Sequence, residues 1–164
     1  MLNSTNLIKL VNNGDEAVKL STRGRYGTMA LLDLSLHWGP TPVPLKDVAR
    51  RRNISLHYLE HLIAPLIGAG ILGSVRGAKG GVQLLRPPQE VKLSEVIPLL
   101  EGSTAFVECL DNPESCPSYD LCVTRDIWDE MKKAIDGVLE STTLQDLVER
   151  QKEREQPTKS MYYI

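Results

Sequence analysis

Residues 45–86 read LKDVARRRNISLHYLEHLIAPLIGAGILGSVRGAKGGVQLLR, and this stretch holds the clearest structural pattern in the chain. Its first eight residues predict a short helix with an apolar face and an exposed run of three arginines, Arg50 to Arg52. A tight turn follows, and Ser55 is placed to cap the next helix because its hydroxyl can accept hydrogen bonds from backbone N–H groups. That next helix is predicted from an i, i+3, i+4 apolar stripe: Leu59, Leu62, Ile63, Leu66 and Ile67.

Pro65 lies well inside this helix, where we expect it to remove a hydrogen bond and to bend the axis. Gly68 and Gly70 are expected to end the helix. Two short apolar segments follow, at residues 71–75 and 82–85, and the basic, glycine-rich sequence RGAKGG joins them. Short apolar segments around such a turn predict a β-hairpin.

The residues before this stretch predict one more helix. Residues 25–38 carry apolar side chains on one face, and Gly39-Pro40 ends the pattern. Helix, helix, turn, helix and hairpin is the order of a winged helix-turn-helix, and residues 19–88 have the length of such a DNA-binding domain. The alternative, a three-helix bundle with an incidental hairpin, is disfavoured by the basic tip and the three arginines. The predicted fold class is therefore mainly α with a small β-hairpin.

The residues after the hairpin predict a linker and a long helix. Residues 94–101 can form a short helix, and the loop that follows holds two prolines that oppose regular structure. From residue 123 to about residue 140, apolar residues recur at near-heptad spacing, which predicts an amphipathic helix that needs a partner surface. A second copy of the chain is the commonest partner, so we expect a homodimer. The predicted parts are an N-terminal extension outside the core fold (residues 1–18), the DNA-binding domain (residues 19–88), a linker with the loop (residues 89–122), a dimerisation helix (residues 123–150) and a flexible tail (residues 151–164).

The net charge of −2 conceals two blocks of opposite sign. Residues 19–86 hold ten Lys or Arg against three Asp or Glu, a balance of +7. Residues 87–164 hold eight against sixteen, a balance of −8, and the first 18 residues carry −1. A basic block followed by an acidic one indicates a unit that binds a polyanion, joined to a part that faces something else. A chance fluctuation of charge in an ordinary domain remains the alternative.

Several classes of protein are disfavoured by what the sequence lacks. No apolar run approaches the roughly 18 residues that span a membrane, and the first 17 residues do not have the pattern of a secretory signal. We therefore expect a cytoplasmic protein without a membrane partner. No phosphate-binding glycine loop, no metal-ligand histidine pair and no Cys–His nucleophile pair is visible, so we do not expect an enzyme.

The only cysteines are Cys109, Cys116 and Cys122, with six and then five residues between them. Three cysteines within one loop suggest chemistry rather than core packing. Structural zinc favours shorter gaps and a nearby histidine, whereas iron–sulfur clusters accept thiolates at varied spacing. A disulfide would leave one thiol unpaired and is disfavoured in a reducing cytoplasm. An iron–sulfur cluster, a zinc ion and thiol redox chemistry all stay open at this point.

Taken together, these segments resemble the IscR-type iron–sulfur-cluster regulators, bacterial transcription factors that control cluster biogenesis and related stress genes. The resemblance runs from Lys19 to about Gln151 and leaves the first 17 residues without a counterpart. It rests on the three-cysteine loop and on four segments that are specific in combination: KLSTRGRYG, ISLHYLEHL, SVRGAKGGVQL and CVTRDIW. The family's members are homodimeric winged-helix proteins that bind a two-iron, two-sulfur cluster, or a four-iron cluster in some relatives.

The resemblance implies that Cys109, Cys116 and Cys122 are the cluster ligands. One position departs from the family's pattern. A histidine three residues after the last cysteine serves there as the fourth ligand, and in this chain the position is Arg125, which cannot bind iron. The fourth ligand would then come from Asp126, from Asp120, from the partner subunit or from an exogenous group. Related nitric-oxide sensors use an aspartate near the start of the first helix, where this chain has Arg25.

The resemblance also implies a set of DNA-contacting residues. Ser55, His57, Glu60 and His61 match the positions that read the major groove, where a carboxylate such as that of Glu60 can accept from cytosine. Arg76 matches an arginine of the wing that enters the minor groove. A solvent-facing helix surface is the alternative for Glu60 and His61. The remaining expected contacts to DNA are Arg23, Arg25 and Lys79.

The predicted function is an iron–sulfur-cluster-dependent transcriptional regulator, a repressor of cluster-assembly genes that binds palindromic double-stranded DNA as a dimer. Its cluster, a two-iron form with the four-iron form as the alternative, would sense cluster, iron or redox status, and cluster-assembly proteins would be its donors. The alternative is a repressor of the same fold without a cluster, responsive to a thiol or a metabolite, as in relatives that control cysteine metabolism.

Overall fold

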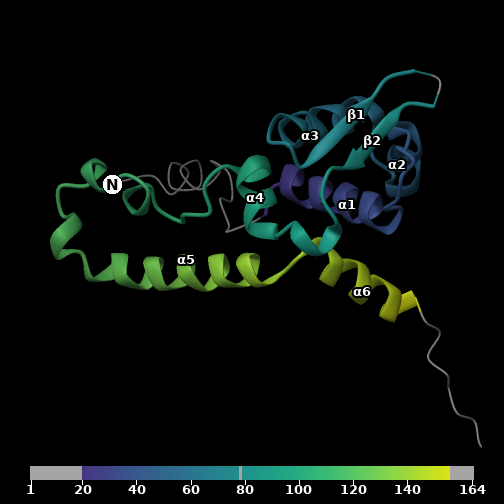
Figure 1. Ribbon diagram of the computed structural model, residues 1–164. Coiled ribbons are helices and arrows are strands. Elements are labelled where there is room, and N and C mark those ends of the chain that lie inside the picture. The colour runs from purple at the N-terminus through teal and green to yellow at the C-terminus, as the bar shows by residue number, and fades with distance from the viewer. Residues whose placement is uncertain (1–19, 78, 156–164) are drawn as a thin grey trace, which may run out of the picture.

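The computed structural model describes residues 20–77 and 79–155 (Figure 1). The expected N-terminal extension, residues 1–18, and the last nine residues of the expected tail lie outside this part of the chain. The regular elements, in chain order, are α1 (Thr22–Leu36), α2 (Leu45–Arg52), α3 (Leu56–Gly68), β1 (Leu72–Val75), β2 (Gly81–Leu84), α4 (Leu93–Glu101), α5 (Val123–Ser141) and α6 (Leu144–Glu155). Short 3-10 turns are η2 (Pro88–Glu90), η3 (Glu108–Leu110), η4 (Pro113–Ser115) and η5 (Tyr119–Leu121).

The first three helices and the hairpin form the predicted winged-helix body. Their apolar faces meet in one core, in which Leu31 of α1, Leu59 of α3 and Leu84 of β2 are almost completely buried. Helix α4 packs against α1, and α6 returns from the far end of the chain to contact α1 as well, so that Leu144 joins the same core. The predicted fold class, mainly α with a small β-hairpin, is confirmed.

The hairpin is extended by a third short segment. Strands β1 and β2 pair antiparallel, with Leu72 opposite Leu84. Val43, in the proline-rich stretch before α2, exchanges both backbone hydrogen bonds with Val82, at 2.8 and 2.9 Å. Gly81 lies directly against the Val43 carbonyl, where a Cβ atom would collide with backbone. The wing is therefore anchored to the segment that leads into α2.

Helix α3 continues through Pro65 to Gly68. The position is tolerated because proline removes one backbone donor but leaves the rest of the helix ladder intact. The apolar stripe predicted for this helix is buried at Leu59, Leu62, Ile63 and Leu66 and is partly exposed at Ile67.

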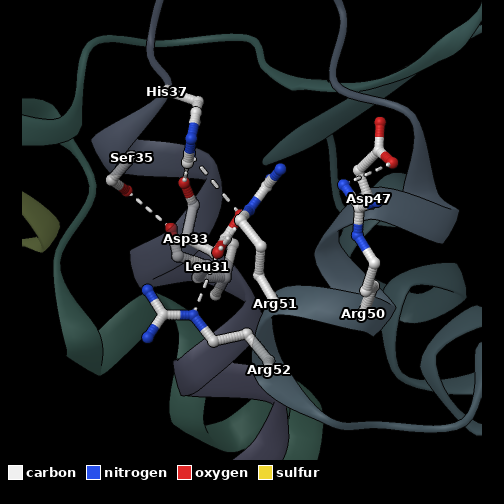
Figure 2. A network of polar contacts seen from close by, with 8 residues as sticks. All are labelled: Leu31, Asp33, Ser35, His37, Asp47, Arg50, Arg51 and Arg52. Carbon is white, nitrogen blue, oxygen red and sulfur yellow. Dashed lines mark hydrogen bonds and ion pairs between the residues drawn. The ribbon is translucent and has the colours of Figure 1, made fainter.

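The three arginines of α2 were all expected to be exposed. Arg50 and Arg51 are exposed, and the expectation is wrong for Arg52, although both Arg51 and Arg52 pair with a buried carboxylate. The Asp33 carboxylate of α1 is buried, with 2% of its side chain exposed, and it accepts from Arg51 Nη2 at 2.5 Å and from Arg52 Nε at 3.0 Å. Figure 2 shows both guanidinium groups reaching Asp33, while Arg50 pairs with Asp47 away from this network. The Arg52 side chain is only 19% exposed, against 78% for Arg50, because burying the Asp33 charge requires cationic partners.

Helix α5 projects away from the body, and the cysteine loop lies at its distant end (Figure 1). No residue of α5 is buried in this single chain. The loop, expected to lack regular structure, contains the three turns η3, η4 and η5, each only one turn long because its prolines and short hydrogen-bond spacing do not support a longer helix. Helix α6 runs to Glu155, five residues into the expected flexible tail, and Gln151 bonds Glu155 one turn later at 2.6 Å.

In the part of the chain that the structure describes, none of the helices is both long and apolar enough to cross a lipid bilayer.

Candidate nucleic-acid interface and cysteine loop

The outer face of α3 carries the side chains expected to read the major groove. Ser55 caps the helix as predicted, its Oγ accepting from the Tyr58 N–H at 3.3 Å. His57, Glu60 and His61 are exposed on the face opposite the buried stripe. A polar, exposed face on a helix whose other side is fixed in the core is a surface that can be presented to a groove.

A pair of tyrosines joins the start of α3 to the start of α1. The Tyr58 hydroxyl lies 3.3 Å from Thr22 Oγ1, and the rings of Tyr26 and Tyr58 meet edge to face with centroids 6.1 Å apart. The guanidinium of Arg25 stacks on Tyr26 at 4.6 Å and donates to its hydroxyl at 2.8 Å. Arg25 is thereby held beside the start of α3. The link through Tyr58 was not predicted, because nothing in the α3 pattern shows which helix this half-buried ring contacts.

The wing presents its own cations. Arg76 follows β1 and Lys79 lies at the tip, and both are exposed. Gly77 has a φ of +108°, which side chains with a Cβ rarely adopt. Gly80 donates to the Gly77 carbonyl at 2.9 Å and lies so close to backbone that a Cβ would collide with it. The glycines therefore allow a tight turn that carries two cations. Figure 1 shows this hairpin reaching out from the body.

The structure places each cysteine beside a separate short turn. Cys109 lies within η3, Cys116 directly follows η4, and Cys122 forms the N-cap of α5 after η5. All three are free thiols and half-buried. Among the described residues, no three His, Cys, Asp or Glu side chains lie close enough together to hold a metal ion, so the thiols are not gathered around one point.

The surroundings of Cys122 favour the thiolate form of its side chain. The Thr124 hydroxyl lies 3.2 Å from Cys122 Sγ, and this hydrogen bond, helped by the Arg125 backbone N–H, lowers the pKa of the thiol. The position at the N-terminus of α5 acts in the same direction, because the helix dipole favours negative charge there. Thiolate is the form that binds metals and attacks disulfides.

Arg125, at the position where the resemblance to IscR-type regulators implies a histidine ligand, has a structural role. Its guanidinium stacks on the Tyr119 ring at 4.3 Å, and its Nη1 donates to the Tyr119 carbonyl at 2.6 Å. Nη2 donates to Asp126 Oδ1 at 3.1 Å. These contacts fasten η5 to the first turn of α5 and so position Cys122 between them. They also engage Asp126, one of the residues considered as a fourth ligand, whereas Asp120 is exposed.

The other end of the loop is fastened to the middle of α5. Thr104 donates to Asp136 Oδ1 at 3.0 Å, and Lys132 donates to the other oxygen of the same carboxylate at 2.7 Å. The Lys132 hydrogen bond lowers the pKa of Asp136, and the Thr104 hydrogen bond acts in the same direction. Both ends of the loop are therefore tied to α5, one near its start and one near its middle.

The predicted apolar stripe of α5 is present and solvent-exposed in the single chain. The large side chains on it are Ile127, Trp128, Met131, Ile135 and Val138, each more than a third exposed. Helix α5 is held to the body at its C-terminal end, where Ser94 donates to Glu140 Oε2 at 2.6 Å and Lys92 pairs with the same carboxylate. A row of apolar side chains of this length, left uncovered, is typical of an interaction surface.

Comparison with known proteins places this geometry in a family. A family model described as "Iron-dependent Transcriptional regulator", Rrf2, matches residues 20–150. The protein named rrf2 from Nitratidesulfovibrio vulgaris is 44% identical over 131 residues, which are 80% of this chain and 87% of that protein. Among solved structures, T. potens IscR is 41% identical with a TM-score of 0.72, covering 92% of this chain and all of that one.

The solved structure of CymR, described as the global cysteine regulator of B. subtilis, is also similar, with 38% identity and a TM-score of 0.68. It covers 80% of this chain and 97% of that one. The expected resemblance to IscR-type regulators is confirmed, and these relatives are regulators rather than enzymes. This chain therefore belongs to the Rrf2 family of DNA-binding transcriptional regulators.

Proposed function

We propose that this chain is a homodimeric repressor whose DNA binding depends on an iron–sulfur cluster held by Cys109, Cys116 and Cys122. The observation that carries the proposal is the set of three free, half-buried thiols on one loop that is fastened at both ends to α5. No other cysteine exists in the chain, so its thiolate chemistry is concentrated at this place.

The donor set fits such a cluster. Iron–sulfur clusters are held by thiolates from loops at varied spacing, and the lowered pKa of Cys122 favours the ligating form. A bound cluster would supply a redox-sensitive and iron-dependent group, and a two-iron form is the one we favour. Because the thiols are not gathered in the present arrangement, binding requires this loop to draw together.

The fourth ligand remains to be supplied from outside the cysteine set. Arg125 is a cation engaged with Tyr119 and Asp126, so neither Arg125 nor the Asp126 carboxylate it binds is well placed to serve. Asp120, the partner subunit or an exogenous group are the remaining candidates. A cluster with an oxygen ligand or an open position would be lost more readily than one with four strong protein ligands.

The DNA-binding part of the proposal rests on the exposed polar face of α3 and on the wing. Ser55, His57, Glu60 and His61 would contact base edges in the major groove. Arg76 would enter the minor groove, and the other basic residues, Arg23, Arg25 and Lys79, would contact phosphates. Two copies joined through the α5 stripe would match a palindromic operator, since the dimer's twofold axis is repeated in the DNA.

A second candidate function is a repressor without a cluster that responds to thiol state or to a metabolite. It is favoured by the likeness to the B. subtilis global cysteine regulator and by the activated Cys122 thiol. In either case a chromosomal operator is the target, so the proposed location is the cytoplasm, with cluster-assembly proteins as donors in the first case.

Anaerobic purification followed by iron and sulfide quantitation separates the two candidates. The cluster proposal expects brown protein with stoichiometric iron and sulfide, and operator affinity that differs between the loaded and cluster-free forms. Colourless protein whose operator binding instead follows oxidation of Cys122 supports the second candidate. A Cys116→Ala variant with full iron content would show that the three cysteines are not the cluster ligands.

A further inference from the structure

Two histidines face each other on the exposed surface of α3. His57 and His61 lie one helical turn apart, and their Nε2 atoms are 3.3 Å from one another. The rings meet edge to face with centroids 4.6 Å apart, and both side chains are exposed to solvent. The third histidine of the chain, His37, lies at the end of α1 and contacts the Asp33 carbonyl instead.

The separation of the two Nε2 atoms matches a shared metal ion. Imidazole nitrogens lie about 2.0–2.1 Å from Zn²⁺ in tetrahedral sites, and two ligands of one tetrahedron are then about 3.3 Å apart. Histidines at i and i+4 of one helix are also a recurring spacing for metal ligands. This pair was not recognised from the sequence, although its spacing is visible there.

We propose that His57 and His61 form a two-histidine chelate on α3 for a divalent transition-metal ion such as Zn²⁺. No third His, Cys, Asp or Glu of the described residues joins the pair, so water would fill the other positions. Structural zinc sites use four protein ligands. A site with two ligands on an exposed helix is therefore exchangeable, as a responsive site requires.

The consequence for DNA rests on the proposed function. Each Nε2 bound to a metal can no longer exchange a hydrogen bond with a base edge, while the added charge of the ion attracts phosphates of any sequence. Metal binding is therefore expected to lower the ratio of operator affinity to random-DNA affinity, rather than to abolish DNA binding.

The metal site is tested on the full-length, cluster-free chain with its cysteines alkylated, because thiolates would compete for zinc. Calorimetric titration with Zn²⁺ at about pH 8, where ordinary imidazole is neutral, should show one ion per chain. His57→Gln and His61→Gln should each weaken binding at least tenfold, while the matched control His37→Gln should not. In NMR spectra, the ring signals of His57 and His61 should shift with zinc and those of His37 should stay. Equal zinc affinity in all four proteins would overturn the chelate.

The coupling to DNA is tested by measuring operator and random-DNA affinity with EDTA and with saturating Zn²⁺. When zinc is added, the ratio of operator affinity to random-DNA affinity should fall roughly tenfold for the wild type and should stay unchanged for His61→Gln. An unchanged ratio with the site occupied would overturn the coupling and leave the regulator proposal standing. Absence of operator binding in EDTA by both the cluster-loaded and the cluster-free protein would instead contradict the proposed function, while the zinc isotherm would still decide the chelate.

Discussion

Glu101 Oε1 accepts two hydrogen bonds from Ser21, one from its backbone N–H at 3.0 Å and one from its Oγ at 2.9 Å. Glu101 is the last residue of α4, directly before the cysteine loop, and Ser21 is the N-cap of α1. The Ser21 hydroxyl also accepts from the Arg23 N–H at 3.0 Å. A single carboxylate therefore joins the start of the cysteine loop to the start of the helix that carries two of the proposed DNA contacts.

This link predicts an effect of Glu101→Ala on stability and on signalling. The change leaves the Ser21 donors without their partner, so the free energy of unfolding should fall by about 1–2 kcal/mol. Operator affinity should also become less dependent on the state of the cysteines. Urea unfolding and operator titrations of loaded and cluster-free protein measure the two effects. Glu108→Ala, at an exposed position within the loop, is the matched control, and equal behaviour of the two variants would contradict the link.

The buried charge of Asp33 predicts a larger loss of stability. Asp33→Asn leaves Arg51 and Arg52 without the carboxylate they share, and removing one partner of a buried ion pair costs about 3 kcal/mol or more. Asp47→Asn breaks the exposed pair with Arg50 and should cost less than about 1 kcal/mol. Chemical denaturation of both variants provides the comparison. A similar small loss in each would mean that water solvates the Asp33 site.

The network around Asp33 also shows where sequence patterns stop being informative. The apolar periodicity of α3 and the glycines of the wing are local features, and both elements formed where expected. The pairing of Asp33 with Arg51 joins residues 18 positions apart, and no period connects them. One signal was available: Asp33 interrupts the apolar run LLDLSL, and a carboxylate on the buried side of a helix needs a cation.

The cysteine loop illustrates a second limit. Its three 3-10 turns are single turns with i to i+3 hydrogen bonds, and elements this short have no repeating apolar pattern to detect. The role of Arg125 was equally hidden. The sequence showed that an arginine cannot bind iron, but its stacking on Tyr119 depends on the turn that brings residue 119 back to the start of α5.

The environment of Cys122 predicts a pH dependence of its reactivity. Since hydrogen bonding from Thr124 lowers the pKa of the thiol, thiolate should form at a lower pH than in an ordinary cysteine. In cluster-free protein, the rate of alkylation at Cys122 should therefore reach half of its maximum at a lower pH than it does for an ordinary cysteine. Thr124→Val should move that midpoint upward, toward the ordinary value, whereas Ser118→Ala should leave it in place. Peptide mapping after timed iodoacetamide treatment measures the profile, and a midpoint unchanged by Thr124→Val would contradict the assignment.

The exposed stripe of α5 predicts how the chain dimerises. Met131→Asp places a charge in the centre of the stripe, where dimer formation would bury it, so the variant should sediment as a monomer. Its operator affinity should fall steeply, because a single half-site provides few contacts. Lys133→Asp adds a carboxylate at a position 74% exposed in its side chain and should leave the dimer intact. A tight dimer in the Met131→Asp variant would move the interface to another surface.

Arg76 and Glu60 predict two distinguishable defects in DNA recognition. Arg76 lies on the glycine-rich wing, where small neighbours allow a guanidinium to approach a narrow groove closely, so Arg76→Ala should weaken operator binding by about 1–3 kcal/mol. Glu60 lies on the exposed face of α3, and a carboxylate there repels base acceptors as well as accepting from cytosine. Glu60→Ala should therefore bind its operator almost as well while binding non-cognate sites better. Competition on a randomised operator library measures both. Unchanged base preferences with weaker binding in Glu60→Ala would show that this carboxylate does not read sequence.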